Sequence, residues 1–197
     1  ASMALALAAF GSGSDPQPLA SRPLPEGRRT YTSAALPHGA KITRTEVRQA
    51  QGSLPEVCIV RGQLVSSPEP TIQSAVELPA LAQWNGKTLT IGGGGLDGFI
   101  PTDDPWYQQL VGPSANPYVK ISSDSGHQSR GFEWAKNDVA LRNHAFDANH
   151  FVLEVGTTIA TEFYGKRPVR RYHMGHSNGG RSGLISAQKY PKDYDGV

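Results

Sequence analysis

The sequence has little cysteine, little excess charge and no long apolar run, and each shortage excludes a class of protein. Cys58 is the only cysteine, so no internal disulfide can form. Its thiol is either buried, which we favour, or paired with a cysteine outside this chain. A formal net charge of +2 with 18% charged residues argues against a dedicated nucleic-acid binder and against disorder over most of the length. No segment approaches the roughly 20 apolar residues of a membrane span.

The first 40 residues differ in composition from the rest of the chain. Residues 1–10 are mostly apolar and are followed by Gly and Ser, which is typical of the end of a secretory signal and its cleavage zone. Residues 11–40 are rich in Gly, Ser, Pro, Ala and Arg, as expected of a flexible leader. We therefore predict a signal remnant and leader over residues 1–40, a catalytic domain over 41–197, and a secreted or periplasmic location.

Short β-branched or apolar runs bounded by Gly and Pro predict strands, and a later change of period predicts helices. The expected strands are residues 57–60, 72–78, 87–91 and 118–121, and the expected helices are residues 137–148 and 151–164. The first two strands should open the sheet as an antiparallel pair, and Gly165 should end the second helix. Alternating strands and helices predict an α/β fold, namely a mixed, mostly parallel sheet with helices on both faces.

The most informative stretch is Gly175–Arg181, which reads GHSNGGR and lies between a predicted strand at residues 168–174 and a predicted helix at residues 181–190. A G-x-S-x-G pattern in this context is a nucleophile elbow, with Ser177 exposed on a strained turn. The backbone N–H of Asn178, at the positive end of the helix dipole, is then a candidate oxyanion-hole donor. An ordinary glycine-rich turn is the alternative. His176 adjoins the serine but should point away from it, so a packing role is favoured over that of a base.

A second glycine-rich stretch, Gly92–Gly95, directly follows a predicted strand. Unshielded backbone N–H groups in such a loop can bind an oxyanion or a phosphate. No Gly-Lys-Ser/Thr follows, so a Walker loop is excluded, and no helix opens at the loop as a dinucleotide site requires. In α/β-hydrolases the second oxyanion donor follows the third strand, so we assign Gly93 and Gly94 to that role. A flexible loop without function is the alternative.

The remaining polar groups carry weaker signals. Asp124, Ser125 and His127 could be a catalytic trio, but residues so close in sequence rarely converge on one hydroxyl, so a structural loop near the active-site rim is favoured. No set of His, Cys, Asp or Glu has metal-binding spacing, and no cofactor is expected in this chain. Four acidic and histidine residues on the predicted helices are interpreted as solvated or capping groups: Asp138, His144, Asp147 and His150.

The order of residues predicts that this chain does not hold a whole catalytic triad. An α/β-hydrolase places the acid and the histidine after the serine. The twenty residues after Ser177 contain Asp193 and Asp195 but no histidine. A sheet ending at the nucleophile strand would also expose an unpaired edge. We therefore expect a partner, the C-terminal remainder of the same enzyme, either as a second chain or as residues outside this sequence.

Taken together, four stretches resemble the tannase and feruloyl esterase family: Gly92–Gly98, Asp124–His127, Phe163–Gly165 and Gly175–Val197. The resemblance implies a secreted α/β-hydrolase that cleaves carboxylic esters of phenolic acids through a serine. It implies Ser177 as nucleophile, with Asn178 and the glycine loop as oxyanion donors. The family's aspartate, histidine and large lid domain, which often carries a structural calcium ion, would all lie beyond Val197.

Two positions depart from the family pattern. Members typically have a cysteine before the nucleophile, linked by a disulfide beside the catalytic histidine, whereas this chain has His176. Asn178 replaces the usual threonine. A branch acting on other esters therefore stays open. So do a non-catalytic binding module with the hydrolase shape, a transferase that passes the acyl group to an alcohol, and a peptidase.

Overall fold

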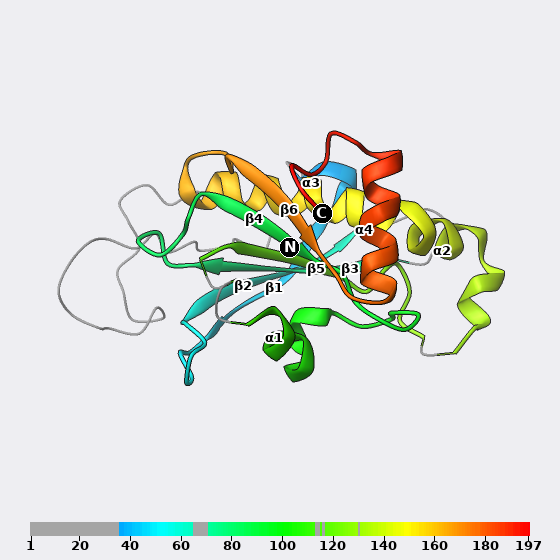
Figure 1. The fold of residues 1–197 in the computed structure, drawn as a ribbon, viewed down its shortest axis with the longest axis horizontal. Helices are drawn as coiled ribbons and strands as arrows, with labels where there is room; N and C mark the ends of the chain where they lie inside the picture. Colours follow the sequence, from blue (N-terminus) through cyan, green and yellow to red (C-terminus); the bar gives the residue numbers. More distant parts are fainter. Residues whose placement is uncertain (1–35, 65–70, 113–114, 116, 130) are drawn as a thin grey trace.

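The computed structural model describes residues 36–64, 71–112, 115, 117–129 and 131–197. These residues build one six-stranded sheet with helices on both of its faces, as Figure 1 shows. The strands are β1 (Lys41–Arg48), β2 (Val57–Leu64), β3 (Ile72–Pro79), β4 (Lys87–Ile91), β5 (Val119–Ser123) and β6 (Arg170–Met174). The helices are α1 (Pro105–Val111), α2 (Asp138–Arg142), α3 (Ala148–Tyr164) and α4 (Asn178–Lys189), with short 3-10 turns at Pro37–Gly39, Pro101–Asp103 and Glu133–Lys136.

The sheet is mixed, with the strand order β1-β2-β3-β5-β4-β6. β1, β2, β3 and β5 pair antiparallel in succession, whereas β4 pairs parallel with both β5 and β6. The predicted antiparallel pairing of β2 and β3 is confirmed, but the sheet opens one strand earlier, with β1. Among the described strands, two pairings are parallel and three are antiparallel, so the parallel share is smaller here than expected.

The chain adds β5 to the sheet on one side of β4 and then adds β6 on the other side, so the order of strand addition reverses. From β4 the chain crosses through α1 to β5 on one side, and from β5 it crosses through α3 to β6 on the other side. Figure 1 shows α1 on one face of the sheet, with α3 and α4 on the opposite face. In open α/β sheets, a reversal of strand order opens a crevice at the carboxyl ends of the strands, where ligands bind. The carboxyl ends of β4, β5 and β6 are therefore the first place to look for a site.

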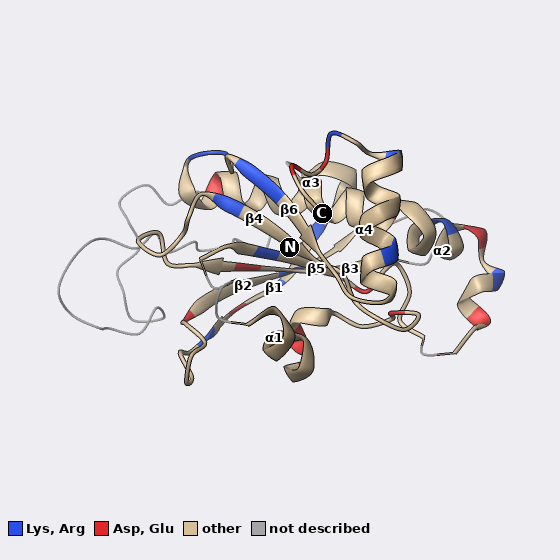
Figure 2. Cartoon of the chain, in the orientation of Figure 1, with Lys and Arg blue, Asp and Glu red and all other residues tan. Residues whose placement is uncertain are grey.

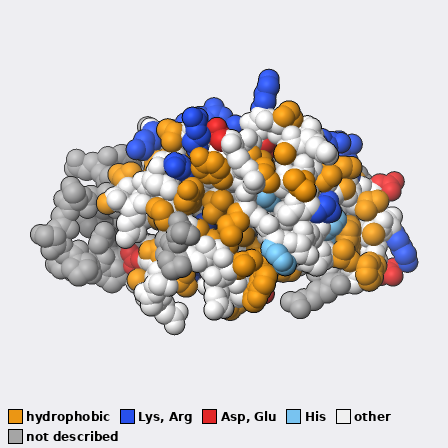
Figure 3. All heavy atoms as spheres, in the orientation of Figure 1, with side chains coloured by type: hydrophobic (Ala, Val, Ile, Leu, Met, Phe, Trp, Pro, Cys, Tyr) orange, Lys and Arg blue, Asp and Glu red, His pale blue; other side chains and the backbone are white. Residues whose placement is uncertain are grey.

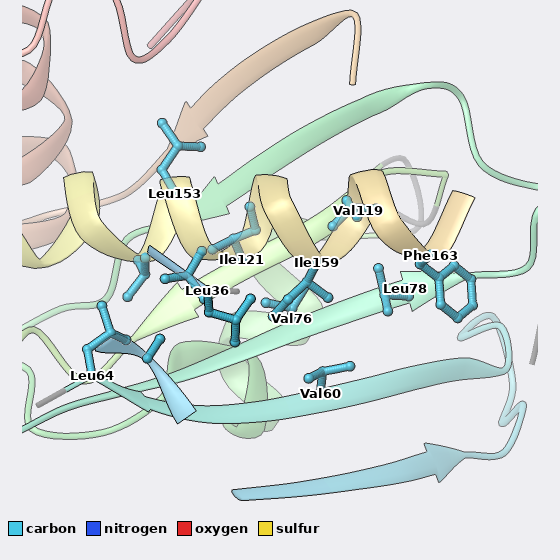
Figure 4. Packing of buried hydrophobic residues seen from close by; sticks show 14 of the residues in the cluster. Leu36, Val60, Leu64, Val76, Leu78, Val119, Ile121, Leu153, Ile159 and Phe163 are labelled. Carbon is cyan, nitrogen blue, oxygen red and sulfur yellow. The ribbon is translucent and has the colours of Figure 1, made fainter. Parts of the chain in front are cut away.

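The main core lies between α3 and the sheet (Figure 4). Leu153 and Ile159 of α3 are buried beside Val76 of β3 and Ile121 of β5. Gly156 lets the helix approach closely, because a Cβ there would lie 2.6 Å from Cδ1 of Ile121. Gly165 ends α3 in the left-handed conformation with φ 68°, as predicted.

The helical region is more continuous than expected. The sequence predicts separate helices over residues 137–148 and 151–164, but α2 runs into α3 through one π-helical turn, Asn143–Asp147. A single apolar stripe cannot distinguish one helix with a π-turn from two helices, since the extra residue only rotates the stripe. Such turns are frequent at functional sites.

A buried charge cluster crosses the sheet. Glu77 of β3 is directly opposite Lys120 of β5 in the register, and Figure 2 shows acidic and basic segments within these strands. Glu77 accepts from Arg48 Nη1 at 2.7 Å, and Lys120 Nζ lies 3.4 Å from its other oxygen. Burial of a lone carboxylate is costly, so these two cations favour this register over a slipped one.

The N-terminal boundary of the folded part lies before residue 41. Leu36 and Ala40 are buried in the main core, with a short 3-10 turn between them. The last five residues of the expected leader therefore belong to the fold, and residues 1–35, including the expected signal remnant, lie outside the described residues. Cys58 is half-buried, and burial raises the pKa of its thiol to about 11. No helix in the described ranges is long and apolar enough to cross a membrane.

The outer edge of the sheet carries exposed hydrophobic side chains. β6 pairs with β4 on one side, and among the described residues only a short parallel bridge between Tyr172 and Gly196 lies on the other. Val169 and Leu184 are each 67% exposed in this region. Figure 3, in the same view, shows hydrophobic side chains gathered over this face.

Candidate active site

Three loops meet at the carboxyl ends of the parallel strands. Gly92–Gly98 follows β4, Asp124–Gln128 follows β5, and Gly175–Ser177 follows β6. Because these strands are neighbours in the order β5-β4-β6, their loops share one edge of the sheet. The fold thus brings together all three stretches that sequence analysis singled out there.

Ser177 occupies a sharp turn between β6 and α4. Its backbone has φ 55° and ψ −119°, a conformation that side-chain-bearing residues rarely adopt. The residue is exposed, and its hydroxyl does not cap the helix. A Cβ on Gly175 would collide with the backbone of Gly179, so the turn requires glycine there. A strained, exposed serine between a strand and a helix is what a nucleophile elbow requires, so Ser177 remains the candidate nucleophile.

The glycine loop packs directly against the start of α4. A Cβ on Gly179 would lie 2.6 Å from the carbonyl oxygen of Gly93, so the two backbones touch. Gly92 N–H donates to the carbonyl of Met174 at 2.9 Å and extends the β4–β6 ladder to the elbow. Within the described residues, the N–H groups of Gly93, Gly94 and Asn178 make no backbone hydrogen bond outside helices and strands. They remain the candidate oxyanion donors that the sequence indicates.

Aromatic residues of α1 border the loop. The hydroxyl of Tyr107 lies against Gly94, where a Cβ would collide with it. Trp106 packs edge-on to Tyr107 and is 52% exposed. His176 is exposed, and its ring centroid lies 6.2 Å from that of Trp106. A packing role for His176 stays a prediction.

A hydrogen-bonded chain ties the glycine loop to α4 and to the loop after β5. The buried carboxylate of Asp97 accepts from the hydroxyl of Ser125 and, at 2.6 Å, from Nδ2 of Asn178. Arg181 Nε donates to Oδ1 of Asn178 at 2.6 Å. Burial raises the pKa of Asp97, while the hydrogen bonds from Ser125 and Asn178 and the charge of Arg181 oppose that rise.

The loop after β5 is structural, as predicted. Asp124 accepts from the backbone N–H groups of Gln73 and Gly126, and His127 Nε2 lies 2.8 Å from the carbonyl of Leu96. Asp124 and His127 therefore do not converge on the hydroxyl of Ser125. Burial raises the pKa of Asp124 to about 6 and lowers the pKa of His127.

Two of the helical polar groups were misassigned as solvated or capping. Asp147 is only 3% exposed and accepts from the hydroxyl of Tyr190 and from Arg142 Nε. His150 Nδ1 lies 2.8 Å from Asp193, and its ring stacks on Tyr190. These contacts clamp the end of α4 to α3 through residues 43 positions apart.

His144 and Asp138, the other two polar groups on the helices, differ in their exposure to solvent. His144 is half-buried next to Trp134, and burial lowers its pKa to about 4, so this assignment was also wrong. Asp138 is exposed in the first turn of α2, as expected of a solvated residue at a helix start.

Sequence analysis missed Asp97, Tyr107 and Arg181 as parts of this site. Asp97 adopts φ 58°, and its place within a glycine-rich run was the only available signal of an unusual backbone. Arg181 Nη2 donates to the carbonyl of His144 at 2.9 Å, a contact that depends on the unpredicted π-turn. No group of three or more His, Cys, Asp or Glu that could hold a metal ion occurs in the part of the chain that the structure describes.

Comparisons with known proteins agree on one family. The sequence profile of the family described as tannase and feruloyl esterase matches residues 58–197. An uncharacterised esterase of Agrobacterium fabrum is 41% identical over 151 residues, which cover 72% of this chain and 27% of that protein. A probable feruloyl esterase B-2 of Aspergillus flavus is 30% identical over 167 residues, covering 84% of this chain and 30% of that protein.

Solved structures share the fold. Feruloyl esterase B from Aspergillus oryzae superposes with a TM-score of 0.68 at 24% identity, over 80% of this chain and 33% of that one. Tannin acyl hydrolase from Aspergillus niger gives a TM-score of 0.62 at 21% identity, over 83% of this chain and 34% of that one. The chain spans about a third or less of the length of these relatives.

Proposed function

Since this chain belongs to the tannase and feruloyl esterase family, we propose that it carries the nucleophile half of a serine carboxylesterase acting on esters of phenolic acids. The observation that carries the proposal is Ser177, exposed on a left-handed turn between a parallel strand and a helix. The substrate class is proposed from the relatives, which are named as an esterase and a feruloyl esterase.

In the proposed reaction, the hydroxyl of Ser177 attacks the ester carbonyl and loses its proton to a base. The negative charge that develops on the carbonyl oxygen is held by the N–H of Asn178 and by N–H groups of Gly93 and Gly94. The alcohol leaves, and water then releases the acid from the acyl-enzyme.

The base and its orienting carboxylate are proposed to come from residues outside this chain. No histidine in the described ranges hydrogen-bonds to Ser177, and Asp193 is already engaged with His150. The same residues would cover the exposed edge at β6 and α4. Export of the protein and a calcium-bearing lid remain proposals from the family resemblance.

The test is labelling of the complete protein with a fluorophosphonate, followed by intact-mass and peptide analysis. We expect one adduct, on Ser177, and hydrolysis of methyl ferulate or a galloyl ester. Ser177→Ala should lose the adduct and lower kcat by a factor on the order of 10⁶. His176→Ala, which removes the neighbouring imidazole, is the matched control and should keep both the adduct on Ser177 and the wild-type kcat.

Unchanged turnover in Ser177→Ala would refute the assignment. A protein that takes the label but forms mainly transfer products when an alcohol is added would be an acyltransferase instead. A protein that neither reacts with the label nor cleaves any ester would be a binding module with the hydrolase shape.

A further inference from the structure

The carboxylate of Asp97 uses both oxygens to join three elements. It lies on the loop after β4, accepts from Ser125 on the loop after β5, and accepts from Asn178 at the first position of α4. The side chain is buried, with the residue only 8% exposed. We propose that Asp97 is a positioning residue that holds the two halves of the oxyanion hole, the glycine loop and the start of α4, at the spacing that catalysis needs. This inference rests on the proposed function.

The glycine loop is shaped to present this carboxylate. Asp97 has φ 58°, and its N–H donates to the carbonyl of Gly94 at 3.0 Å, which closes a tight turn. The turn folds the side chain back against the loop, so that a Cβ on Gly93 would lie 3.2 Å from Oδ2 of Asp97. The carboxylate therefore lies next to Gly93, one of the proposed donors, and fills the space that a side chain there would need.

On the other side, the amide of Asn178 is held at both ends. Its Nδ2 donates to Asp97, and its Oδ1 accepts from Nε of Arg181. The guanidinium of Arg181 is anchored in turn to the carbonyls of His144 and Ala145. The backbone of Asn178, which bears the other proposed donor, is thereby fixed to the same network.

A merely structural role explains this arrangement less well. Burying a carboxylate costs free energy unless hydrogen bonds replace its water. One of the two oxygens of Asp97 accepts from Ser125, and the other accepts from Asn178, the residue after the proposed nucleophile. Displacing a catalytic group by about 1 Å can lower the rate by a factor on the order of 10², so hydrogen bonds that fix the spacing of the donors would raise the rate enough to offset the free-energy cost of burying Asp97.

The experiment compares three forms of the complete protein: wild type, Asp97→Ala and Asp97→Asn. Asp97→Ala should lower kcat by about 10- to 100-fold and change KM by less than about 3-fold, because the oxyanion forms only in the transition state. Asp97→Asn should be clearly faster than Asp97→Ala, with a kcat within about 3-fold of wild type. Its Oδ1 can accept from Asn178, and its Nδ2 can donate to the hydroxyl of Ser125, which also accepts.

Rates are to be divided by the number of active sites titrated with fluorophosphonate, so that unfolded protein does not count. Asp103→Ala is the matched control, because this substitution also removes two hydrogen bonds, both donated by Arg61, and Asp103 lies outside the Asp97–Asn178 network. It should keep the wild-type kcat. Should Asp97→Ala not fold, Asn178→Ala cuts the same tie from the other side and should show the same loss in kcat, with its backbone donor intact.

The outcomes separate the two claims. Wild-type kcat per titrated site in Asp97→Ala, or Asp97→Asn as slow as Asp97→Ala, would overturn the positioning role while leaving Ser177 as nucleophile. A wild-type protein without turnover or label at Ser177 would overturn both. A double variant of Asp97 and Asn178 no slower than the slower single variant would support one shared tie.

Discussion

At the scale of single residues, the candidate site concentrates unfavourable local states. Ser177 and Asp97 both have positive φ without being glycine, and Asp97 is also a buried acid. Such states persist only where the surrounding structure enforces them, and they cluster at active sites. Here the enforcing contacts are those between the glycine backbones of the loop and of α4, which pack too closely for the chain to follow a different course.

Asp124 makes stability depend on pH in a way that one substitution can isolate. Because burial raises the pKa of its carboxyl to about 6, the folded protein keeps the proton on Asp124 to a higher pH than the unfolded chain does. Its contribution is complete below about pH 4 and is lost as the pH rises through about 6. Since each pKa unit is worth 1.36 kcal/mol and the unfolded carboxyl is already largely ionised at pH 4, wild type should lose about 2 kcal/mol relative to Asp124→Asn between pH 4 and pH 7.

Denaturant unfolding of both proteins across this range measures the difference. Asp138→Asn, at the exposed start of α2, controls for removal of a carboxylate at the surface. A constant difference between wild type and Asp124→Asn would mean that Asp124 is ionised throughout and has no such role.

How far single residues could be predicted depended on where their partners lie in the chain. Ser177 was predictable because its motif and both flanking elements lie within a few residues. Asp147 and His150 were not, since their partners Tyr190 and Asp193 are 43 residues away and α4 brings them back. Asp97 contacts Asn178 across 81 positions.

At the scale of elements, the contact between the glycine loop and α4 can be tested with two adjacent glycines. A Cβ on Gly179 would meet the backbone of Gly92 and Gly93, whereas a Cβ on Gly180 would meet only the carbonyl of Gly175, at 3.6 Å. Gly179→Ala should therefore push the loop from the helix, costing about 1–3 kcal/mol of stability and about 10²-fold in kcat. Gly180→Ala should keep kcat and add about 0.5–1 kcal/mol of stability, because alanine favours the helix.

Thermal unfolding and ester turnover of the two variants give both quantities. Equal behaviour of the pair would show that the loop can move away from α4 without consequence, and would remove the steric argument for the oxyanion hole.

Elements were predictable where apolar residues followed one period. The buried strands β2 to β5 were found for that reason. β1 was missed because its sequence, KITRTEVR, is mostly charged or polar, as suits a strand exposed at the sheet edge. α1 was missed because seven residues are too few for a helical period to emerge.

At the scale of the whole molecule, the proposed covering of β6 and α4 predicts a strong effect at an exposed position. Leu184 of α4 is 67% exposed in this chain. If further residues of the enzyme bury it, Leu184→Asp should destabilise the complete protein by about 3 kcal/mol, because a carboxylate would then lose its water. Leu81→Asp, at a position 39% exposed in the loop between β3 and β4, should cost less than about 1 kcal/mol.

Denaturant unfolding of the two variants of the complete protein makes the comparison. A loss at Leu184 no larger than that at Leu81 would contradict the covering of this face.

The hydrogen bonds at both ends of the Asn178 side chain also affect how fast this residue is chemically degraded. Asparagine is a thermolabile residue, and before glycine the next backbone nitrogen can attack its side-chain carbonyl carbon and expel ammonia, after which water opens the cyclic imide to isoaspartate or aspartate. In the fold that nitrogen, of Gly179, donates to the carbonyl of His176 at 3.0 Å, and both ends of the Asn178 amide are engaged. Once unfolding frees them, an aspartate formed there would face Asp97 on refolding. The folding free energy thus sets the chemical lifetime of the site, and each unfolding event exposes it to permanent damage.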